Sequence, residues 1–381
     1  MEGFSSCLLV YVCVSSVLGT AAVLKLLPQV QISQRLVLSA GLLVTLERLC
    51  YTYLGGFTGS VICWLTFLLF LFHSFSPPQL SVQGKAVFIT GCDSGFGKTI
   101  AQHFDSMGFK VFATVLNKDG PGAIELVQMC SEELTLIQMD LTKPQDIENA
   151  VQFTKEKLGE KGLWGLVNNA GICINIGDAE LSLMSNYRGC MEVNFFGAIT
   201  ITKAFLPLIR REKGRIVNVS SPAGETPFPS FAAYGASKAA LTLFTNILRQ
   251  ELNFWGVKVC TILPGFYKTA KVQDHTHWEQ QNCNLLKNLS SELLQDYGEE
   301  YILEIKNQFL KRIHFAKEDF SPVIDSITDA VLSTNPRPRY YAGKDVIIQY
   351  IILNFLPITI SDLLFNRFFI QHKILPKALH K

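Results

Sequence analysis

The segment "KAVFITGCDSGFGKTIAQHF" at 85–104 decides the fold, because an apolar strand-like run passes through three glycines into a helical pattern. The glycines, Gly91, Gly95 and Gly97, follow the spacing G-x-x-x-G-x-G. Glycines at such a turn let the backbone approach a pyrophosphate, and the unpaired N–H groups of the helix N-terminus favour its charge. A tight turn without a ligand also uses glycine, so the interpretation depends on the rest of the chain.

Short β-branched runs alternate with helical stretches after this turn. The strand-like runs lie at 85–90, 110–115, 134–140, 162–171, 214–221 and 257–265, with a short last one at 339–343. Residues 279–315 read as helical. This alternation predicts an α/β fold with a doubly wound parallel sheet covered by helices on both faces.

Small and polar residues recur where the predicted strands end, which is where a parallel sheet binds its ligands. Asp140 can accept a hydrogen bond from an adenine amino group, "NNAG" (168–171) can line the adenine ribose, and Thr269 can hold a nicotinamide carboxamide. With the glycine turn, they predict a dinucleotide site. The predicted cofactor-binding residues are Gly91, Asp93, Ser94, Gly95, Phe96, Gly97, Asp140, Asn168, Ala170, Gly171, Tyr234, Lys238, Pro264, Gly265 and Thr269.

The stretch "YGASK" (234–238) carries the candidate chemistry. Tyr234 and Lys238 are four residues apart, so their side chains share one helical face. An ordinary phenol has a pKa of about 10, but a nearby ammonium and the positive charge of an oxidised nicotinamide both favour the phenolate. Tyr234 can then remove the hydroxyl proton of an alcohol while hydride leaves its carbon. Ser221 can donate a hydrogen bond to the substrate oxygen, and Asn194 can order a water molecule beside Lys238.

The loop between Ser221 and Tyr234 predicts an apolar wall for a flat polycyclic alcohol. The predicted substrate-binding residues are Ser221, Pro222, Pro227, Phe228, Pro229 and Tyr234. The segment 278–298 is a candidate lid, with simple loop packing as the alternative. His275 and His277 resemble a metal-binding pair, but a third ligand is not evident, so we expect no metal.

The apolar residues gather at the start of the chain. Hydrophobic residues make up 48% of the 381 residues and charged ones 17%. Residues 54–72 form a charge-free run long enough to cross a membrane, and 4–24 form a second one, for which a cleaved signal peptide is the alternative. The net charge of +2, without a clustered basic face, argues against a nucleic-acid partner. Ten scattered cysteines suggest a reducing compartment. We expect a membrane anchor of two or three spans at 1–75, a catalytic domain at 76–345 and an apolar and basic membrane-associated tail at 346–381.

Together these motifs resemble the short-chain dehydrogenase/reductase family over residues 85–270. The resemblance rests on "TGCDSGFG", "NNAG", "PG" and the four residues Asn194, Ser221, Tyr234 and Lys238. It implies a seven-stranded Rossmann-like sheet, a Tyr234 base and a Lys238 that also holds the nicotinamide ribose. Further stretches, among them "CMEVNFFGA" and "SPAGETPFP", resemble the membrane-bound hydroxysteroid dehydrogenases of this family.

That closer resemblance implies a steroid substrate and NAD-dependent oxidation of the 11β-hydroxyl of glucocorticoids. It also implies the endoplasmic reticulum membrane, with the catalytic domain facing the cytosol, and a homodimer is the assembly we consider. Oxidation of 17β-hydroxysteroids or of retinol, and a non-catalytic NAD-sensing membrane scaffold, are the alternatives. The acidic residue that usually follows the second strand is absent, since Thr114 and Asn117 stand there. Asp93 favours NAD over NADP, whereas Lys118 opposes this choice.

Overall fold

The computed structural model describes residues 79–343, 346, 356–369 and 374–380. The predicted membrane spans at 1–75 and part of the predicted tail at 346–381 lie outside these residues. The chain divides into two compact units, Met1–Pro78 and Gln79–Lys381, and the structure described below belongs to the second.

Seven parallel strands form one sheet in the order β3-β2-β1-β4-β5-β6-β7. The predicted seven-stranded, doubly wound parallel sheet is therefore confirmed. The chain leaves β1 toward β2 and β3, and then returns to the other side of β1 with β4, so the strand order reverses between β1 and β4. Ligands bind at such a point because the loops there diverge to opposite faces. The strands are β1 (Ala86–Ile89), β2 (Lys110–Val115), β3 (Leu134–Gln138), β4 (Gly165–Asn168), β5 (Arg215–Val219), β6 (Lys258–Pro264) and β7 (Arg339–Ala342).

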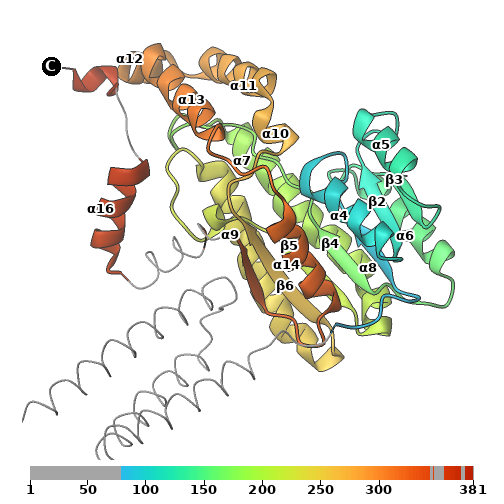
Figure 1. Cartoon of the computed structure of the whole chain (residues 1–381). Helices are drawn as coiled ribbons and strands as arrows, with labels where there is room; N and C mark the ends of the chain where they lie inside the picture. The colour runs from blue at the N-terminus through green and yellow to red at the C-terminus, as the bar shows by residue number, and fades with distance from the viewer. Residues whose placement is uncertain (1–78, 344–345, 347–355, 370–373, 381) are drawn as a thin grey trace, which may run out of the picture. The chain divides into compact units, whose positions relative to one another are not determined.

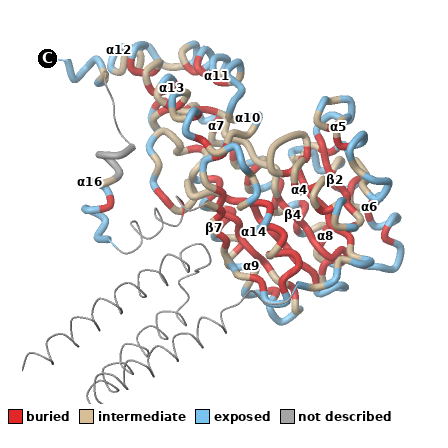
Figure 2. Tube along the Cα trace, viewed as in Figure 1, coloured by how far each residue is buried: buried red, intermediate tan, exposed pale blue. Residues whose placement is uncertain are grey.

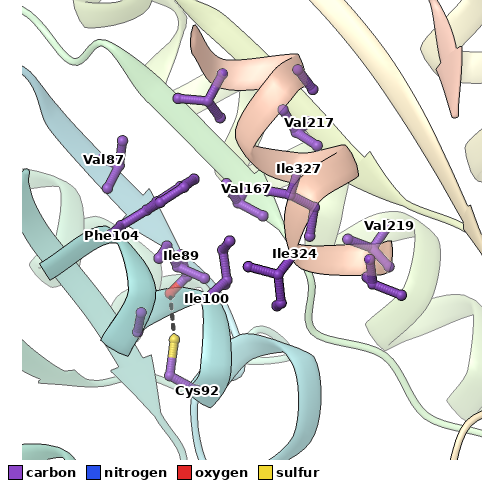
Figure 3. Close-up of a cluster of buried hydrophobic side chains, with 14 of the residues drawn as sticks. Val87, Ile89, Cys92, Ile100, Phe104, Val167, Val217, Val219, Ile324 and Ile327 are labelled. Atoms are coloured by element: carbon purple, nitrogen blue, oxygen red, sulfur yellow. Dashed lines mark hydrogen bonds between the residues drawn. The ribbon is translucent and has the colours of Figure 1, made fainter. Parts of the chain in front are cut away.

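Helices cover both faces of this sheet (Figures 1 and 2). The strand side chains alternate between two cores. Val87 and Ile89 of β1 belong to one core, while Phe88 between them belongs to the other. The first core is closed by α4 (Gly95–Ser106), α5 (Pro121–Met129) and α14 (Ser321–Leu332), as Figure 3 shows for α4 and α14. The second core is closed by α6 (Pro144–Leu158), α8 (Ala198–Glu212) and α9 (Ala232–Glu251).

The helix before β5 is continuous over Met184–Glu212 but changes its winding in the middle. It consists of α7 (Met184–Met191), the π-helical turn η1 (Glu192–Gly197) and α8. By length and hydropathy it is the one helix among the described residues that could cross a membrane. It is instead a helix of the catalytic unit, since Ile201, Phe205 and Ile209 lie fully buried in the second core.

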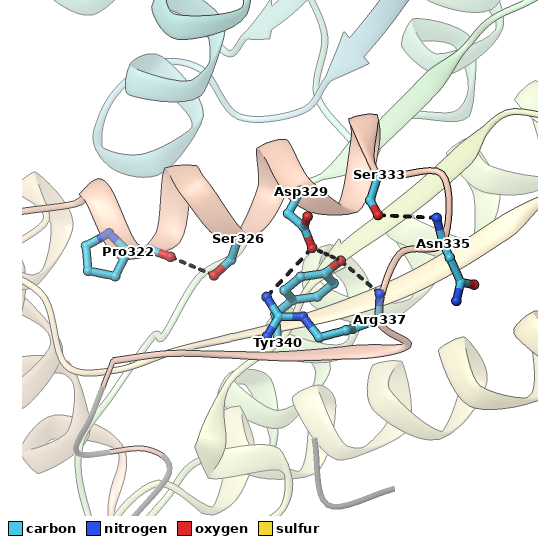
Figure 4. Close-up of polar contacts among 7 residues, drawn as sticks. All are labelled: Pro322, Ser326, Asp329, Ser333, Asn335, Arg337 and Tyr340. Atoms are coloured by element: carbon cyan, nitrogen blue, oxygen red, sulfur yellow. Dashed lines mark hydrogen bonds and ion pairs between the residues drawn. The ribbon is translucent and has the colours of Figure 1, made fainter. Parts of the chain in front are cut away.

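A polar network fixes β7 at the edge of the sheet (Figure 4). The Tyr340 hydroxyl donates to the Asp329 carboxylate at 2.7 Å, and the Arg337 backbone N–H donates to the Tyr340 hydroxyl at 2.9 Å. The Arg337 guanidinium lies 4.5 Å from the centre of the Tyr340 ring. These contacts hold the last strand against α14 although β7 has only four residues.

A small helical layer follows β6 and gathers at one end of the sheet (Figure 1). It comprises α10 (Ala270–Gln273), α11 (His275–Asn288), α12 (Ser291–Tyr297) and α13 (Glu299–Ile313), which confirms the helical prediction for 279–315. Two small apolar clusters stabilise it, one around Leu285 and Ile302 and the other around Trp278 and Phe309. The chain continues to α16 (Ile358–Phe369) and η4 (Lys377–Leu379), which lies against α12. We refer to α10–α13 as the lid layer.

Candidate active site

The turn between β1 and α4 requires its glycines for two different reasons. Gly91 and Gly95 have φ of +71° and +58°, a conformation that L side chains rarely adopt. Gly97 is required for space, because a Cβ there would lie 2.2 Å from the Gly91 carbonyl oxygen. Among the described residues, the side chain of Ser94 makes no capping hydrogen bond to α4, so the first N–H groups of the helix remain available to an anion. This turn therefore fits a pyrophosphate group.

Asn169, which is not among the predicted cofactor residues, holds this turn in place. Its side-chain amide donates to the carbonyl oxygens of Thr90 at 2.9 Å and Gly91 at 3.0 Å. The neighbouring Asn168, which we predicted to line the ribose, is instead 3% exposed and donates to Thr202 and Asn218 inside the second core. The structure does not bring the Asn168 side chain to the glycine turn. The sequence did contain a signal for Asn169, because this residue lies within the "NNAG" motif.

Asp93 reaches from the glycine turn to the end of β2. Its carboxylate accepts a hydrogen bond from the Leu116 backbone N–H at 2.8 Å. The helix α5 approaches closely here, because a Cβ on Gly122 would lie 1.8 Å from the Asp93 carbonyl oxygen. A negative charge therefore lies beside the position where the usual acidic residue after β2 is missing.

Other predicted cofactor residues lie in the loop after β6 and in the first turn of α4. The methyl side of Thr269 lies 3.4 Å from where a Cβ on Gly95 would stand, so the loop after Pro264 and Gly265 meets the glycine turn. The ring of Phe96 packs edge-on against Tyr267 and Phe320, and its contact with a cofactor stays a prediction.

Asp140 lies at the end of β3, partly exposed, and is engaged by its own turn. Its carboxylate accepts from the Thr142 backbone N–H at 2.9 Å and from the Thr142 hydroxyl at 2.7 Å. Burial disfavours its charge, but these hydrogen bonds and the nearby Lys143 ammonium outweigh the burial and lower the pKa of the Asp140 carboxyl. Asp140 is therefore an anionic acceptor at neutral pH, and its contact with adenine stays a prediction.

The four predicted catalytic side chains come together from three elements. Tyr234 and Lys238 lie on α9, with the Lys238 Nζ atom 5.8 Å from the centre of the Tyr234 ring. Lys238 Nζ donates to the Val219 carbonyl oxygen at 2.9 Å. The Ser221 hydroxyl, at the end of β5, shares a hydrogen bond with the Tyr234 phenol. The phenol, the hydroxyl and the ammonium therefore share one site.

Asn194 occupies the π-helical turn η1 and is fully buried. Its Oδ1 atom accepts from the Ile172 N–H at 2.7 Å, and its Nδ2 atom donates to the Ile172 carbonyl oxygen at 2.8 Å and to the Ser237 hydroxyl at 2.9 Å. A Cβ on Gly171 would lie 3.0 Å from Lys238 Nζ and 3.3 Å from Asn194 Oδ1. Gly171 therefore leaves room beside the two side chains, where we predicted a water molecule. The π turn explains the geometry, since such turns rotate a side chain out of the normal helical register.

Burial is the largest influence on the pKa values of Tyr234 and Lys238. It raises the pKa of the Tyr234 phenol, although the hydrogen bond with Ser221 acts in the opposite direction. Burial also lowers the pKa of the Lys238 ammonium from 10.5 to about 8. We had expected Lys238 to lower the phenol pKa. In the protein alone desolvation is the larger effect, so a further positive charge is needed to favour the phenolate.

The predicted substrate wall is only partly enclosed. Pro227 and Pro229 are exposed, while Pro222 and Phe228 are half-buried. An aromatic layer that the sequence analysis missed lies next to Tyr234 and consists of Phe231, Phe309 and Trp278. No local pattern joins these residues, because they come from three separate segments.

The two histidines that resembled a metal-binding pair lie in different surroundings. His277 lies 3.2 Å from the Ile174 carbonyl oxygen through its Nε2 atom, while His275 is exposed. Within the part of the chain that the structure describes, no three histidine, cysteine, aspartate or glutamate residues are grouped as metal ligands would be.

The comparisons with known proteins agree with this geometry. Residues 85–280 match the family model described as short chain dehydrogenase. The 11-beta-hydroxysteroid dehydrogenase type 2 of Homo sapiens is 52% identical over 301 residues, covering 79% of this chain and 74% of that protein. The 17-beta-hydroxysteroid dehydrogenase type 2 of Homo sapiens is 41% identical over 337 residues, covering 88% of this chain and 87% of that protein.

Solved structures show the same fold. A short-chain dehydrogenase from Streptomyces avermitilis superposes with a TM-score of 0.57 at 24% identity, over 69% of this chain and 90% of that protein. This similarity supports the fold and carries no information on the substrate.

Proposed function

The chain belongs to the short-chain dehydrogenase family and is an oxidoreductase, and from that premise we propose that it oxidises the 11β-hydroxyl of glucocorticoids to the ketone with NAD. The observation that carries the substrate is the 52% identity to the human 11-beta-hydroxysteroid dehydrogenase type 2, which extends over 79% of this chain. The site supports the reaction type, because Tyr234, Ser221, Lys238 and Asn194 converge there. The hypothesis of a non-catalytic scaffold loses its support.

The residues of this chain divide the chemistry between them. Ser221 donates a hydrogen bond to the alcohol oxygen and orients it toward the Tyr234 phenol. Tyr234 removes the hydroxyl proton, and Lys238 places a positive charge within 5.8 Å of the phenol ring, which favours the phenolate. Asn194 fixes the backbone at Ile172 and the space beside Lys238. A bound nicotinamide dinucleotide would supply the hydride acceptor and a positive charge.

The cofactor fits the residues around the glycine turn. The glycines leave space for a pyrophosphate, and Lys238 reaches the carboxyl end of β5, where it would hold the nicotinamide ribose. Asp93 supports NAD rather than NADP, because its carboxylate at the end of β2 would repel a 2′-phosphate. The remaining predicted contacts, among them Asp140 and Thr269, belong to this proposal.

The membrane setting and the assembly are also proposals. The apolar runs at 4–24 and 54–72 support an anchored protein. On the resemblance to the membrane-bound hydroxysteroid dehydrogenases, we propose the endoplasmic reticulum membrane with the catalytic domain facing the cytosol. We include the domain limits 1–75, 76–345 and 346–381 and a homodimer in the same proposal.

A second candidate is the oxidation of 17β-hydroxysteroids, favoured by the 41% identity to the human 17-beta-hydroxysteroid dehydrogenase type 2 over more of the chain. Membrane fractions that contain the full chain should distinguish the two. Cortisol, estradiol and retinol are each supplied with NAD or NADP, and the ketone or aldehyde product is measured. We expect cortisol with NAD to react fastest. Faster oxidation of estradiol would transfer the assignment to the second candidate.

The control variant is Tyr234→Phe, which removes the phenolic oxygen and keeps the ring. We expect a loss of turnover of about 100-fold or more, as for removal of a general base, with NADH binding retained. Unchanged turnover in Tyr234→Phe would contradict the proposed chemistry for every substrate.

A further inference from the structure

The carboxylate of Asp178 joins two segments that are far apart in the chain. Asp178 is half-buried in the loop after β4. Its Oδ2 atom accepts a hydrogen bond from the Tyr301 hydroxyl of α13 at 2.7 Å, and its Oδ1 atom accepts a longer one from the Ser230 hydroxyl at 3.5 Å. The backbone reinforces the second contact, because the Gly177 N–H donates to the Ser230 carbonyl oxygen at 3.1 Å. Asp178 therefore connects the lid layer to the loop that precedes α9.

The loop that carries Asp178 is itself fixed by buried polar side chains. The Ser182 backbone N–H and hydroxyl donate to the Asp178 carbonyl oxygen at 3.0 and 3.1 Å. The Asn175 amide donates to the Ser182 hydroxyl at 2.9 Å, and both residues are buried. Asp178 therefore presents its carboxylate from a held position to both Tyr301 and Ser230.

Ser230 governs how the helix that carries Tyr234 begins. Its φ is +71°, a conformation that residues other than glycine rarely adopt, so the surrounding contacts must hold it. Phe231 follows directly as the N-cap of α9, and its carbonyl oxygen accepts from the Gly235 N–H at 2.7 Å. The Phe231 ring centre lies 6.4 Å from that of Tyr234. Tyr234 lies in the first turn of α9, so a shift of Ser230 would move the phenol.

The lid layer supplies two tyrosine hydroxyls to the loop after β4. Tyr301 is 5% exposed and packs in the apolar cluster with Leu181, and burial and the bond to Asp178 raise the pKa of its phenol, which keeps it a donor. Tyr297 lies beside it, with ring centres 5.6 Å apart, and donates to Glu180 at 2.7 Å. Glu180 is exposed. The two bonds have the same length, but the one from Tyr301 is made to the carboxylate that also holds Ser230.

We propose that Asp178 is a positioning residue for Tyr234 and makes the placement of its phenol depend on docking of the lid layer. This inference rests on the proposed role of Tyr234 as the base. Asp178 acts through Ser230 and the first turn of α9. Proton removal requires the phenol within hydrogen-bond reach of the alcohol, and a displacement of about 1 Å can cost up to about 100-fold in rate.

The test replaces Tyr301 with phenylalanine, which keeps the ring in its cluster and removes the donor. Tyr297→Phe is the matched control, because it removes a hydroxyl with the same hydrogen-bond length from the same layer. Turnover is measured with the alcohol that the wild type oxidises fastest, and NADH fluorescence titration counts the folded sites. We expect Tyr301→Phe to lower kcat per NADH-binding site about 10-fold with an unchanged KM for NAD, and Tyr297→Phe to keep the wild-type kcat.

Asp178→Asn provides a second and independent variant. Its amide has one acceptor oxygen and cannot accept from both hydroxyls, so kcat should fall as in Tyr301→Phe. The double variant should lose little more than the larger single loss, because both changes break the same link.

A structural role predicts different results. A lower melting temperature of Tyr301→Phe with an unchanged kcat per NADH-binding site would overturn the proposal, and so would equal losses of kcat in Tyr297→Phe and Tyr301→Phe. Either result leaves the proposed function standing if Tyr234→Phe is inactive. Full turnover in Tyr234→Phe would instead remove the base, and the role of Asp178 would fall with it.

Discussion

Replacing Lys238 with methionine should stabilise the protein at neutral pH while removing most of its activity. Lys238 is 3% exposed, and its ammonium has one described hydrogen bond, to the Val219 carbonyl oxygen at 2.9 Å. Burial lowers its pKa from 10.5 to about 8, so the folded protein releases this proton before the unfolded chain does. Folding therefore disfavours the charged form of Lys238. This lowers the free energy of unfolding by its full amount below pH 8, and the effect disappears as the pH rises to 10.5.

The size of the effect follows from this difference in pKa. It corresponds to about 3 kcal/mol of destabilisation of the wild type at neutral pH. Methionine keeps the apolar stem but leaves the Val219 carbonyl without this donor, a loss of about 1–2 kcal/mol. Relative to the wild type, the free energy of unfolding of the variant should be about 1–2 kcal/mol higher at pH 7 and about 1–2 kcal/mol lower above pH 10.5.

The assay is thermal unfolding of the full chain in detergent at several pH values, without cofactor. The melting temperature of Lys238→Met should exceed that of the wild type by a few degrees at pH 7, and the order should reverse at high pH. Lys203→Met is the control, because Lys203 is exposed on α8 and its replacement should give no such reversal. A variant that is less stable by the same amount at every pH would refute this account of Lys238.

Three further changes test other parts of the site. Gly97→Ala should abolish cofactor binding, measured by NADH fluorescence, because its Cβ would lie 2.2 Å from the Gly91 oxygen; retained binding would contradict the role of the turn. Asn194→Ala should lower the melting temperature and kcat together, since it removes the three hydrogen bonds to Ile172 and Ser237; an unchanged kcat would show that the Asn194 side chain is not needed for turnover. Asp93→Asn should reduce the preference for NAD over NADP about 10-fold in kcat/KM, and an unchanged ratio would exclude Asp93 as its cause.

The sequence determined the parts of this protein that depend on local rules. Alternating strand and helix patterns predicted the parallel sheet, since burial on both faces requires apolar strands. The spacing of Gly91, Gly95 and Gly97 predicted the turn, because backbone conformation and close approach leave few other choices. The separation of four residues placed Tyr234 and Lys238 on one face, since that follows from helical geometry alone.

The tertiary structure decided what depends on residues that are distant in the chain. Asn169 rather than Asn168 holds the glycine turn, because the Asn169 amide donates to Thr90 while the Asn168 amide donates to Thr202. The ionisation of Tyr234 and Lys238 also differs from the expectation, because burial has the largest effect on the pKa of each side chain.

The lid layer shows the same limit of sequence reasoning. Phe231, Trp278 and Phe309 meet beside Tyr234, and Asp178 contacts both Ser230 and Tyr301, although no periodicity connects these positions. A short sequence pattern records the conformation of its own segment. Contacts between segments arise only when the chain packs, because the free energy of burial depends on which surfaces meet.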